Sequence, residues 1–305
     1  MIRIYAAENM KRIIYISALI CLLVCQALAQ DISKGKLQLP NKTIEYYEMK
    51  PAVPVKGLLI LLTGAGEKPK SVYSKTSLPK LLASKGYVTV VPETPIQMFA
   101  DEDFKKALDE LISIKCSQFN ITTANIVLGG FSDGAAIALS YAEYMKGSRG
   151  KDLKAVFSID PPADMARIYK SAQLDTSYKC DLIKREGKGL LDYLNGLFKV
   201  SPDVDLKPYL QHSVFTASSP DGGNARFLTN VPLRLYSEPD LAFVQRTYCN
   251  SLQLININAY DLEKLYAFLK SKGADKVEFI KTAGRGFHSW NILEPEDCVK
   301  WIEGL

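Results

Sequence analysis

The run from residue 125 to residue 143, NIVLGGFSDGAAIALSYAE, constrains the fold of this chain more than any other stretch. It joins a short β-branched segment to an Ala-rich helical segment through GFSDG at residues 130–134, which is G-x-S-x-G between a strand and a helix. The alternative interpretation of this segment is an ordinary glycine-rich turn. A G-x-S-x-G turn between a strand and a helix is tight, so the positions flanking the serine must be nearly free of side chains, which glycine provides. Ser132 is therefore expected at the tip, with its hydroxyl exposed before a helix N-terminus that favours negative charge.

Residues 1–29 have the pattern of a secretory signal peptide. Lys11 and Arg12 precede an apolar run at residues 13–28, and Ala-Leu-Ala at residues 27–29 forms a cleavage site. The alternative is an uncleaved membrane anchor, but the apolar run is shorter than the span of about 20 residues that a bilayer requires. We therefore expect a secreted or periplasmic protein with no stable membrane span after cleavage.

Charge and cysteine content narrow the classes of partner. The formal net charge is +5, and removal of residues 1–29 takes away three basic residues and one acidic residue, which leaves +3. This charge is too small to indicate nucleic-acid binding. With two histidines and no C-x-x-C spacing, we expect no metal site, and no organic cofactor. After cleavage, disulfides and free thiols are both open for the remaining cysteines, which are Cys116, Cys180, Cys249 and Cys298.

Strand and helix signals alternate along most of the remaining chain of about 276 residues. Nearly continuous apolar runs are typical of strands buried on both faces of a parallel sheet, and segments with helical periodicity separate them. The expected strands lie at residues 56–62, 87–91, 126–128, 155–159, 232–236 and 277–281. An antiparallel entry at residues 30–56 precedes them. The pattern predicts an α/β fold with a mostly parallel central sheet flanked by helices.

The alternation of strands and helices breaks between residues 161 and 230. This stretch is partly helical and contains a turn-forming segment rich in Pro, Ser, Gly and Asn. We predict that residues 161–230 form a cap inserted over the carboxyl edge of the sheet. The α/β core then consists of residues 30–160 and 231–305.

A serine hydroxyl is a weak nucleophile until a neighbouring base takes its proton. His288 is the expected base, because it lies in a loop directly after the last predicted strand, where the topology brings it to the same edge as Ser132. The other histidine, His212, falls within the predicted cap and is expected to be a cap or surface residue.

The base also needs a carboxylate that fixes its tautomer and stabilises the imidazolium. Asp240 is favoured, because it follows the next-to-last predicted strand and because Pro239 turns the chain so that this position lies further over the sheet edge. Glu238, in the same loop, is an alternative. Asp160 is another, since it ends the strand that follows the serine helix.

Two backbone N–H groups are expected to bind the oxyanion. One belongs to Asp133, directly after the serine. The other belongs to Ala65, with Gly66 as the alternative, in the loop TGAGE at residues 63–67, where glycine lets the backbone approach a substrate closely. This loop is not a phosphate cradle, because no G-K-[ST] follows it.

The order of these features resembles the α/β-hydrolase superfamily over nearly the whole mature chain. The segments GGFSDG, FSIDPPADMARIYKSA, SPDGGNARFL and RLYSEPD are also similar to an exported α/β-hydrolase group from Bacteroidetes. The resemblance implies Ser132 as the nucleophile, His288 as the base and Asp240 as the acid. It also implies an oxyanion hole made by the N–H groups of Ala65 and Asp133.

Two positions depart from the superfamily pattern. Thr63 stands where many members have a histidine before the first glycine of the oxyanion loop. That histidine is not catalytic and usually braces the loop, so its loss concerns the oxyanion geometry and not the class of reaction. Asp133 places a negative side chain beside the nucleophile, which disfavours anionic acyl groups.

The residues and the resemblance together predict a secreted or periplasmic serine hydrolase that cleaves a small-molecule ester through an acyl-enzyme on Ser132. A serine peptidase of the prolyl-oligopeptidase type is an alternative, although the sequence shows no propeller-like repeat to support it. A non-catalytic binding protein that keeps the fold is the alternative from another class. The sequence does not determine the substrate or the oligomeric state.

Overall fold

The computed structural model describes residues 31–40 and 42–305, so the predicted signal peptide at residues 1–29 lies outside the described residues. The described part is built on an eight-stranded sheet in the order β1-β2-β4-β3-β5-β6-β7-β8. The strands are β1 (Ile32–Gln38), β2 (Thr43–Met49), β3 (Gly57–Leu62), β4 (Tyr87–Pro92), β5 (Ile126–Phe131), β6 (Ala155–Ile159), β7 (Leu233–Ser237) and β8 (Val277–Lys281). The β1–β2 and β2–β4 pairs are antiparallel and the other five pairs are parallel, which confirms the mostly parallel sheet.

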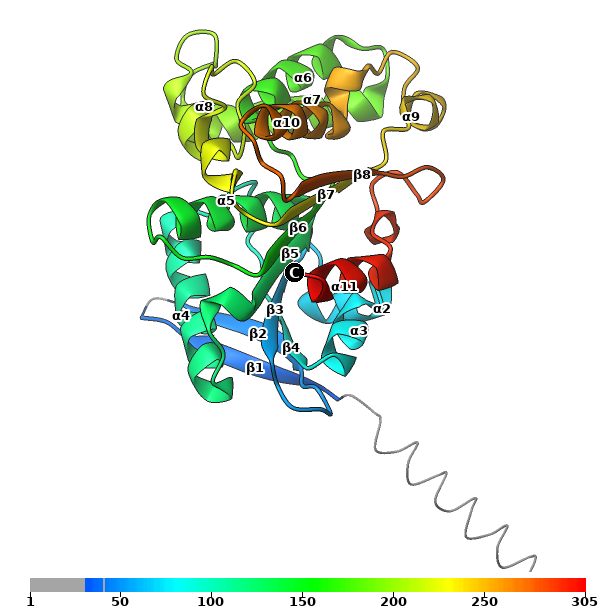
Figure 1. The fold of residues 1–305 in the computed structure, drawn as a ribbon. Helices are drawn as coiled ribbons and strands as arrows, with labels where there is room; N and C mark the ends of the chain where they lie inside the picture. Colours follow the sequence, from blue (N-terminus) through cyan, green and yellow to red (C-terminus); the bar gives the residue numbers. More distant parts are fainter. Residues whose placement is uncertain (1–30, 41) are drawn as a thin grey trace, which may run out of the picture.

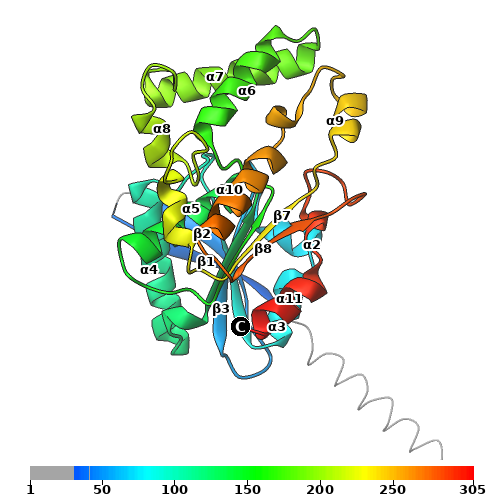
Figure 2. The same ribbon diagram turned by 45° about the horizontal axis from the view of Figure 1, so that its top comes forward.

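Helices cover both faces of this sheet (Figures 1 and 2). One face carries α2 (Val72–Lys75), α3 (Leu78–Ser84) and α11 (Pro295–Glu303), and the other carries α4 (Glu102–Phe119), α5 (Asp133–Gly147) and α10 (Ala259–Ser271). Short 3-10 helices lie at η1 (Pro69–Ser71), η2 (Thr123–Asn125) and η5 (Trp290–Ile292). Because both faces are covered, the inner strands β3, β4, β5 and β6 are buried at every position, which explains their nearly continuous apolar sequences.

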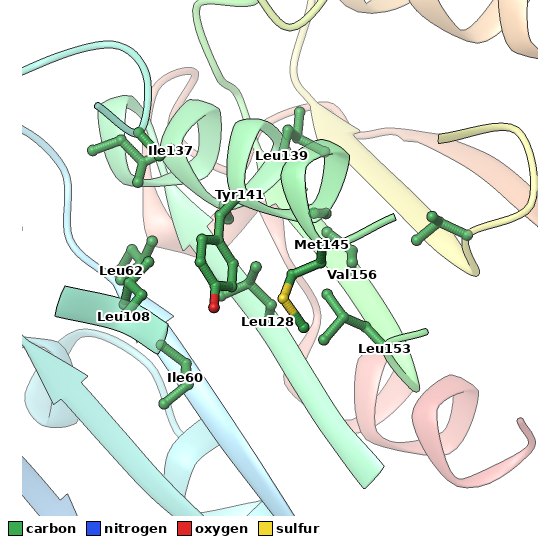
Figure 3. Close-up of a cluster of buried hydrophobic side chains, with 14 of the residues drawn as sticks. Ile60, Leu62, Leu108, Leu128, Ile137, Leu139, Tyr141, Met145, Leu153 and Val156 are labelled. Carbon is green, nitrogen blue, oxygen red and sulfur yellow. The ribbon is translucent and has the colours of Figure 1, made fainter. Parts of the chain in front are cut away.

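Helix α5, which follows Ser132, is fixed by the core beneath it. Figure 3 shows Tyr141 and Met145 of this helix over Leu128 and Val156 of the sheet. Tyr141 is fully buried, and its hydroxyl donates a hydrogen bond of 2.7 Å to Asp109 Oδ1, so its polar end keeps a partner. Helix α5 is therefore packed against the sheet and linked to α4, which carries Asp109.

A group of helices lies beyond the carboxyl edge of the sheet, at the top of Figure 1. We call it the helical lobe. It contains α6 (Met165–Ser177), α7 (Asp181–Phe198), α8 (Lys207–His212) and η3 (Gly223–Leu228), together with α9 (Leu241–Thr247) and η4 (Leu254–Asn256). The last two lie between β7 and α10, outside the predicted cap range of residues 161–230, so a second insertion contributes to the lobe. Among residues 31–40 and 42–305, no helix has both the length and the apolar character needed to span a bilayer.

A disulfide between Cys180 and Cys249 joins the two insertions of the lobe. It connects the residue before α7 with the segment after α9, across 69 positions of sequence, next to buried Ile183 and Val244. Cys116 and Cys298 are free thiols.

Removal of this disulfide is expected to lower the free energy of unfolding by about 4 kcal/mol, because a closed loop of this length restricts the unfolded chain strongly. The measurement compares urea unfolding of the wild type with that of the double variant Cys180→Ala/Cys249→Ala, with and without reductant. Reductant should bring the wild type to the stability of the variant and leave the variant unchanged. Equal midpoints without reductant would contradict the expectation.

Candidate active site

The residues of the candidate site lie at the carboxyl ends of five neighbouring strands. Loop 63–67 follows β3, Ser132 follows β5, Asp160 follows β6, Ser237 ends β7, and the loop with His288 follows β8. The parallel pairing of these strands brings their ends to one edge of the sheet, below the helical lobe.

The turn around Ser132 has little room for side chains. Ser132 has φ 54° and ψ −124°, which is a costly backbone conformation for a residue with a Cβ atom. A Cβ atom on Gly130 would lie 2.6 Å from the backbone of Gly134, and a Cβ atom on Gly134 would lie 2.3 Å from the carbonyl oxygen of Thr63. Both glycines of the GFSDG sequence are therefore required by close backbone approach.

The structure brings His288 into hydrogen-bond contact with Ser132. The distance from His288 Nε2 to Ser132 Oγ is 2.9 Å. The imidazole lies against the ring of Phe131, with centroids 4.7 Å apart, and Phe131 in turn contacts Trp290 at 5.3 Å. This packing holds the ring so that Nε2 faces the hydroxyl.

The carboxylate that contacts His288 is Asp160, and the preference for Asp240 was wrong in this respect. Asp160 Oδ2 lies 2.6 Å from His288 Nδ1, and the hydroxyl of Ser237 donates to Asp160 Oδ1 at 2.6 Å. Asp160 is 4 % exposed, and its carbonyl oxygen accepts a hydrogen bond from Asn258 Nδ2 at 3.0 Å. Asp160, the second of the two sequence alternatives, is therefore the carboxylate that contacts the imidazole.

Asp240 has another partner. Its Oδ1 accepts a hydrogen bond of 2.8 Å from the backbone N–H of Phe243 and caps the start of α9. A carboxylate in this position satisfies an N–H group that the helix leaves without a partner. The apolar helical segment that begins at Leu241 was the sequence signal for this role.

Glu238, the remaining alternative, holds the loop that carries His288. Its carboxylate accepts hydrogen bonds of 2.7–3.2 Å from the backbone N–H groups of residues 285–287, and one of 3.1 Å from the hydroxyl of Thr282. Burial acts to raise the pKa of Glu238, but these hydrogen bonds outweigh burial and lower it below its ordinary value. Glu238 is therefore an ionised anchor for the loop and does not contact the imidazole.

The expected oxyanion donors belong to residues next to or near Ser132 in the structure. A Cβ atom on Gly64 would lie 3.4 Å from Ser132 Cβ, so loop 63–67 passes directly beside the nucleophile. Within the described residues, the backbone N–H groups of Ala65 and Asp133 donate to no protein acceptor. Both are thus available to an oxygen bound beside Ser132 Oγ.

Two neighbouring cavities lie beside the Ser132–His288 pair: Ser132 lines one of them and His288 lines the other. The cavity on the side of Ser132 has a volume of about 500 Å³, and its wall includes Asp133, Met98, Leu190 and Tyr193. The cavity on the side of His288 has a volume of about 360 Å³, and its wall includes Val244, Tyr248, Leu252 and Phe287. Four residues line both cavities, namely Asp175, Glu186 and Asn256 of the lobe and Asn258, which precedes α10.

Negative charge dominates the larger cavity. Burial raises the pKa of Asp133 to about 6, although His288 acts to lower it. Burial, and then the neighbouring Glu186, raise the pKa of Asp175 to about 6, against the effect of Arg167. Arg167 is the one cation among the described residues that line this cavity, and its guanidinium is paired with the buried Asp261.

His212 lies away from this site. Its Nδ1 is 2.8 Å from the carbonyl oxygen of Pro208, and its ring packs at 4.5 Å from Phe99 within the helical lobe. In the described part of the chain, no three His, Cys, Asp or Glu side chains are placed so that they could hold a metal ion.

Comparison with solved structures shows that the chain has the α/β-hydrolase fold, as the sequence predicted. It resembles an acylaminoacyl peptidase from Pyrococcus horikoshii, with a TM-score of 0.58 and 14 % identity over 92 % of this chain and 43 % of that chain. It also resembles esterases from Rhizomucor miehei (TM-score 0.56, 16 % identity, 90 % of this chain and 84 % of that chain). A third similar structure is a putative esterase from Staphylococcus aureus, with a TM-score of 0.56 and 14 % identity over 90 % of this chain and 82 % of that chain. The chain thus spans less than half the length of the peptidase. No protein-family model and no curated protein matches its sequence.

Proposed function

We propose that this protein is a serine hydrolase that cleaves carboxylic esters through an acyl-enzyme on Ser132. One observation carries the proposal. Ser132 Oγ, His288 Nε2, His288 Nδ1 and Asp160 Oδ2 form an unbroken relay with contacts of 2.9 and 2.6 Å. This is the arrangement in which a base takes the serine proton while a carboxylate holds the imidazole in place.

Each side chain has one task in the reaction. His288 Nε2 accepts the proton of Ser132 as Oγ attacks the carbonyl carbon, and returns it to the leaving oxygen. Asp160 keeps the other proton of the ring on Nδ1 and stabilises the imidazolium that forms. The hydroxyl of Ser237 orients Asp160 from its other oxygen. A water molecule then attacks the acyl-enzyme with His288 again as the base.

The developing oxyanion is stabilised by the backbone. In this proposal the N–H groups of Ala65 and Asp133 donate to the oxyanion, and neither has a competing protein acceptor in the described residues. Helix α5 adds the positive end of its dipole, since Asp133 is its first residue. Such preorganised donors stabilise an oxyanion more strongly in a site from which water is partly excluded.

The two cavities suit a small ester. Their volumes fall near or within the range of small-molecule sites. Because His288 protonates the leaving oxygen, the cavity on its side takes the alcohol part and the cavity on the side of Ser132 takes the acyl part. The esterases among the structural neighbours support an ester substrate.

We also propose that the protein is exported. The signal pattern in residues 1–29 supports this, as does the similarity of four segments to an exported group from Bacteroidetes. The Cys180–Cys249 disulfide adds support, because disulfides persist mainly in oxidising compartments.

A fluorophosphonate probe tests the proposed function, because it labels a serine only when that serine is activated. We expect the wild type to be labelled on Ser132 and the Ser132→Ala variant to remain unlabelled. A folded wild type without Ser132-dependent labelling would favour the non-catalytic binding protein.

The peptidase among the structural neighbours makes an amide substrate the second candidate. Comparison of an ester with the corresponding anilide separates these two.

The pKa of Asp133 predicts a pH-dependent substrate preference. With a pKa of about 6, its carboxylate is neutral below that pH and negative above it. The ratio of kcat/KM for a p-nitrophenyl butyrate ester to that for the succinate monoester should therefore rise by about tenfold between pH 5.5 and pH 8. Asp175 lines the same cavity with a pKa of about 6, so the Asp133→Asn variant should keep part of this slope but show a flatter ratio. A ratio as steep as that of the wild type would contradict the role of Asp133.

A further inference from the structure

Glu67 is placed between two loops of the proposed site. Its side chain is 14 % exposed. Oε2 accepts a hydrogen bond from the backbone N–H of Gly64 at 3.1 Å and another from the indole N–H of Trp290 at 3.1 Å. Oε1 lies 3.3 Å from the same indole nitrogen and forms an ion pair with Lys75. Every contact of this carboxylate is thus with the protein, and none is needed for the proton relay.

The contacts of Glu67 fix the turn that presents Ala65. The backbone N–H of Glu67 donates to the carbonyl oxygen of Gly64 at 3.1 Å, while its side chain accepts from the N–H of Gly64. Gly66 completes the turn with φ 70°. Gly64 is therefore held at both of its backbone polar groups, and its N–H is occupied. Ala65 is left to present its own N–H beside Ser132.

Trp290, the indole partner of Glu67, lies close to His288, the proposed base. Trp290 is 5 % exposed and follows His288 by two positions. Its ring packs against Phe131, which in turn packs against the imidazole of His288. Through Trp290, Glu67 connects the loop of the expected oxyanion donor with the loop of the base.

Thr63 does not supply this brace. Its hydroxyl is buried, and within the described part of the chain it has no hydrogen-bond partner. The position that carries a bracing histidine in many superfamily members is therefore not used to hold the loop here. The carboxylate of Glu67 is the group that makes side-chain contacts to both sides of the site.

We propose that Glu67 is a positioning residue for the oxyanion hole: it holds the N–H of Ala65 in place against Ser132 and keeps that donor aligned with His288. The inference rests on the proposed hydrolase function. Glu67 touches neither the substrate nor the reacting atoms. Its effect is to keep a donor in its working position before the oxyanion forms, which is the basis of this kind of stabilisation.

The Glu67→Gln variant tests the inference. Glutamine has nearly the same size but presents one amide N–H₂ to groups that are all donors. Removal of an oxyanion donor costs about 10²–10³ in kcat, so a loosened donor should cost about tenfold. KM should stay near the wild-type value. A trifluoromethyl ketone, whose adduct with the serine carries the oxyanion, should lose affinity by the same factor as kcat.

Two comparisons separate positioning from general destabilisation. Glu303→Gln is the matched control, because Glu303 also pairs with a lysine, Lys56, but lies outside the site. It should keep the wild-type kcat and inhibitor affinity. Urea midpoints show whether the Glu67→Gln enzyme is folded at the assay temperature. A loss of kcat explained by the unfolded fraction, with unchanged affinity of the folded enzyme for the ketone, would overturn the inference.

Trp290→Phe provides a second test that does not alter Glu67. It removes the indole N–H and keeps a ring against Phe131. We expect a smaller fall in kcat, and a double variant with Glu67→Gln that is no worse than Glu67→Gln alone. Independent, multiplying effects would contradict the connection through Glu67. Absence of Ser132-dependent turnover in the wild type would refute the proposed function, whereas normal turnover in Glu67→Gln refutes this inference alone.

Discussion

Replacement of Asp160 by asparagine is expected to lower kcat for ester hydrolysis by about 10⁴, as loss of the orienting carboxylate does in other serine triads. The asparagine keeps the size of the side chain, but its neutral amide does not stabilise the imidazolium. If its N–H₂ group faces Nδ1, the proton moves to Nε2 and His288 no longer accepts from Ser132. The Ser237 hydroxyl gives no substitute, since it contacts the carboxylate and not the ring.

Asp240→Asn is the matched control, because it makes the same chemical change at the residue that the sequence favoured. Asn also caps helices well, so kcat should stay within about twofold of the wild type and stability should change little. Both variants are measured on one p-nitrophenyl ester at pH 8, with urea unfolding as the control for folding. A large loss in Asp240→Asn with normal turnover in Asp160→Asn would restore Asp240 as the acid.

Removal of either His288 or Ser132 is expected to lower kcat by about 10⁶, and the double variant should be no slower than either single variant. The reason is that the two groups act as one unit: the base has no function without the nucleophile, and the nucleophile is not activated without the base. His288→Ala, Ser132→Ala and the double variant are compared in the same ester assay after subtraction of spontaneous hydrolysis. Losses that multiply in the double variant would show that the two residues act independently.

The strands of the core were predictable because each carries its own signal. Residues 277–281 were expected as the last strand and form β8, and the run at residues 232–236 corresponds to β7 within one position. A strand covered on both faces is mostly apolar, so a short, largely apolar run indicates such a strand without reference to the rest of the chain. The short α9 has only a weak signal, an apolar start of seven helical residues after Asp240, and it packs on a lobe that the sequence does not define.

The carboxylate that contacts His288 could be located at the correct edge of the sheet but not chosen from the sequence. Strands β6 and β7 are parallel neighbours, with Ile159 opposite Tyr236, so carboxylates after either strand reach the region of His288. The choice is made by competing partners. Asp240 is engaged by the start of α9 and Glu238 by the N–H groups of residues 285–287, which leaves Asp160 for the imidazole.

The role of Glu67 could not be predicted from the sequence either, because it also depends on long-range partners. The loop at residues 63–67 attracted attention for its glycines, and nothing local indicates that its carboxylate accepts from Trp290, which is 223 positions away. Contacts of this kind exist only after the ends of β3 and β8 reach one edge of the sheet. Long-range side-chain partners are therefore the part of the site that the structure adds.

The most direct measurement is the hydrolysis of p-nitrophenyl esters from acetate to decanoate by the wild type and by Ser132→Ala. We predict turnover by the wild type, with a dependence on acyl length that reflects the cavity beside Ser132, and no turnover above background by the variant. A folded wild type that hydrolyses none of these esters and is not labelled by the fluorophosphonate, or a Ser132→Ala variant as active as the wild type, would contradict the proposal that Ser132 is the nucleophile of a hydrolase.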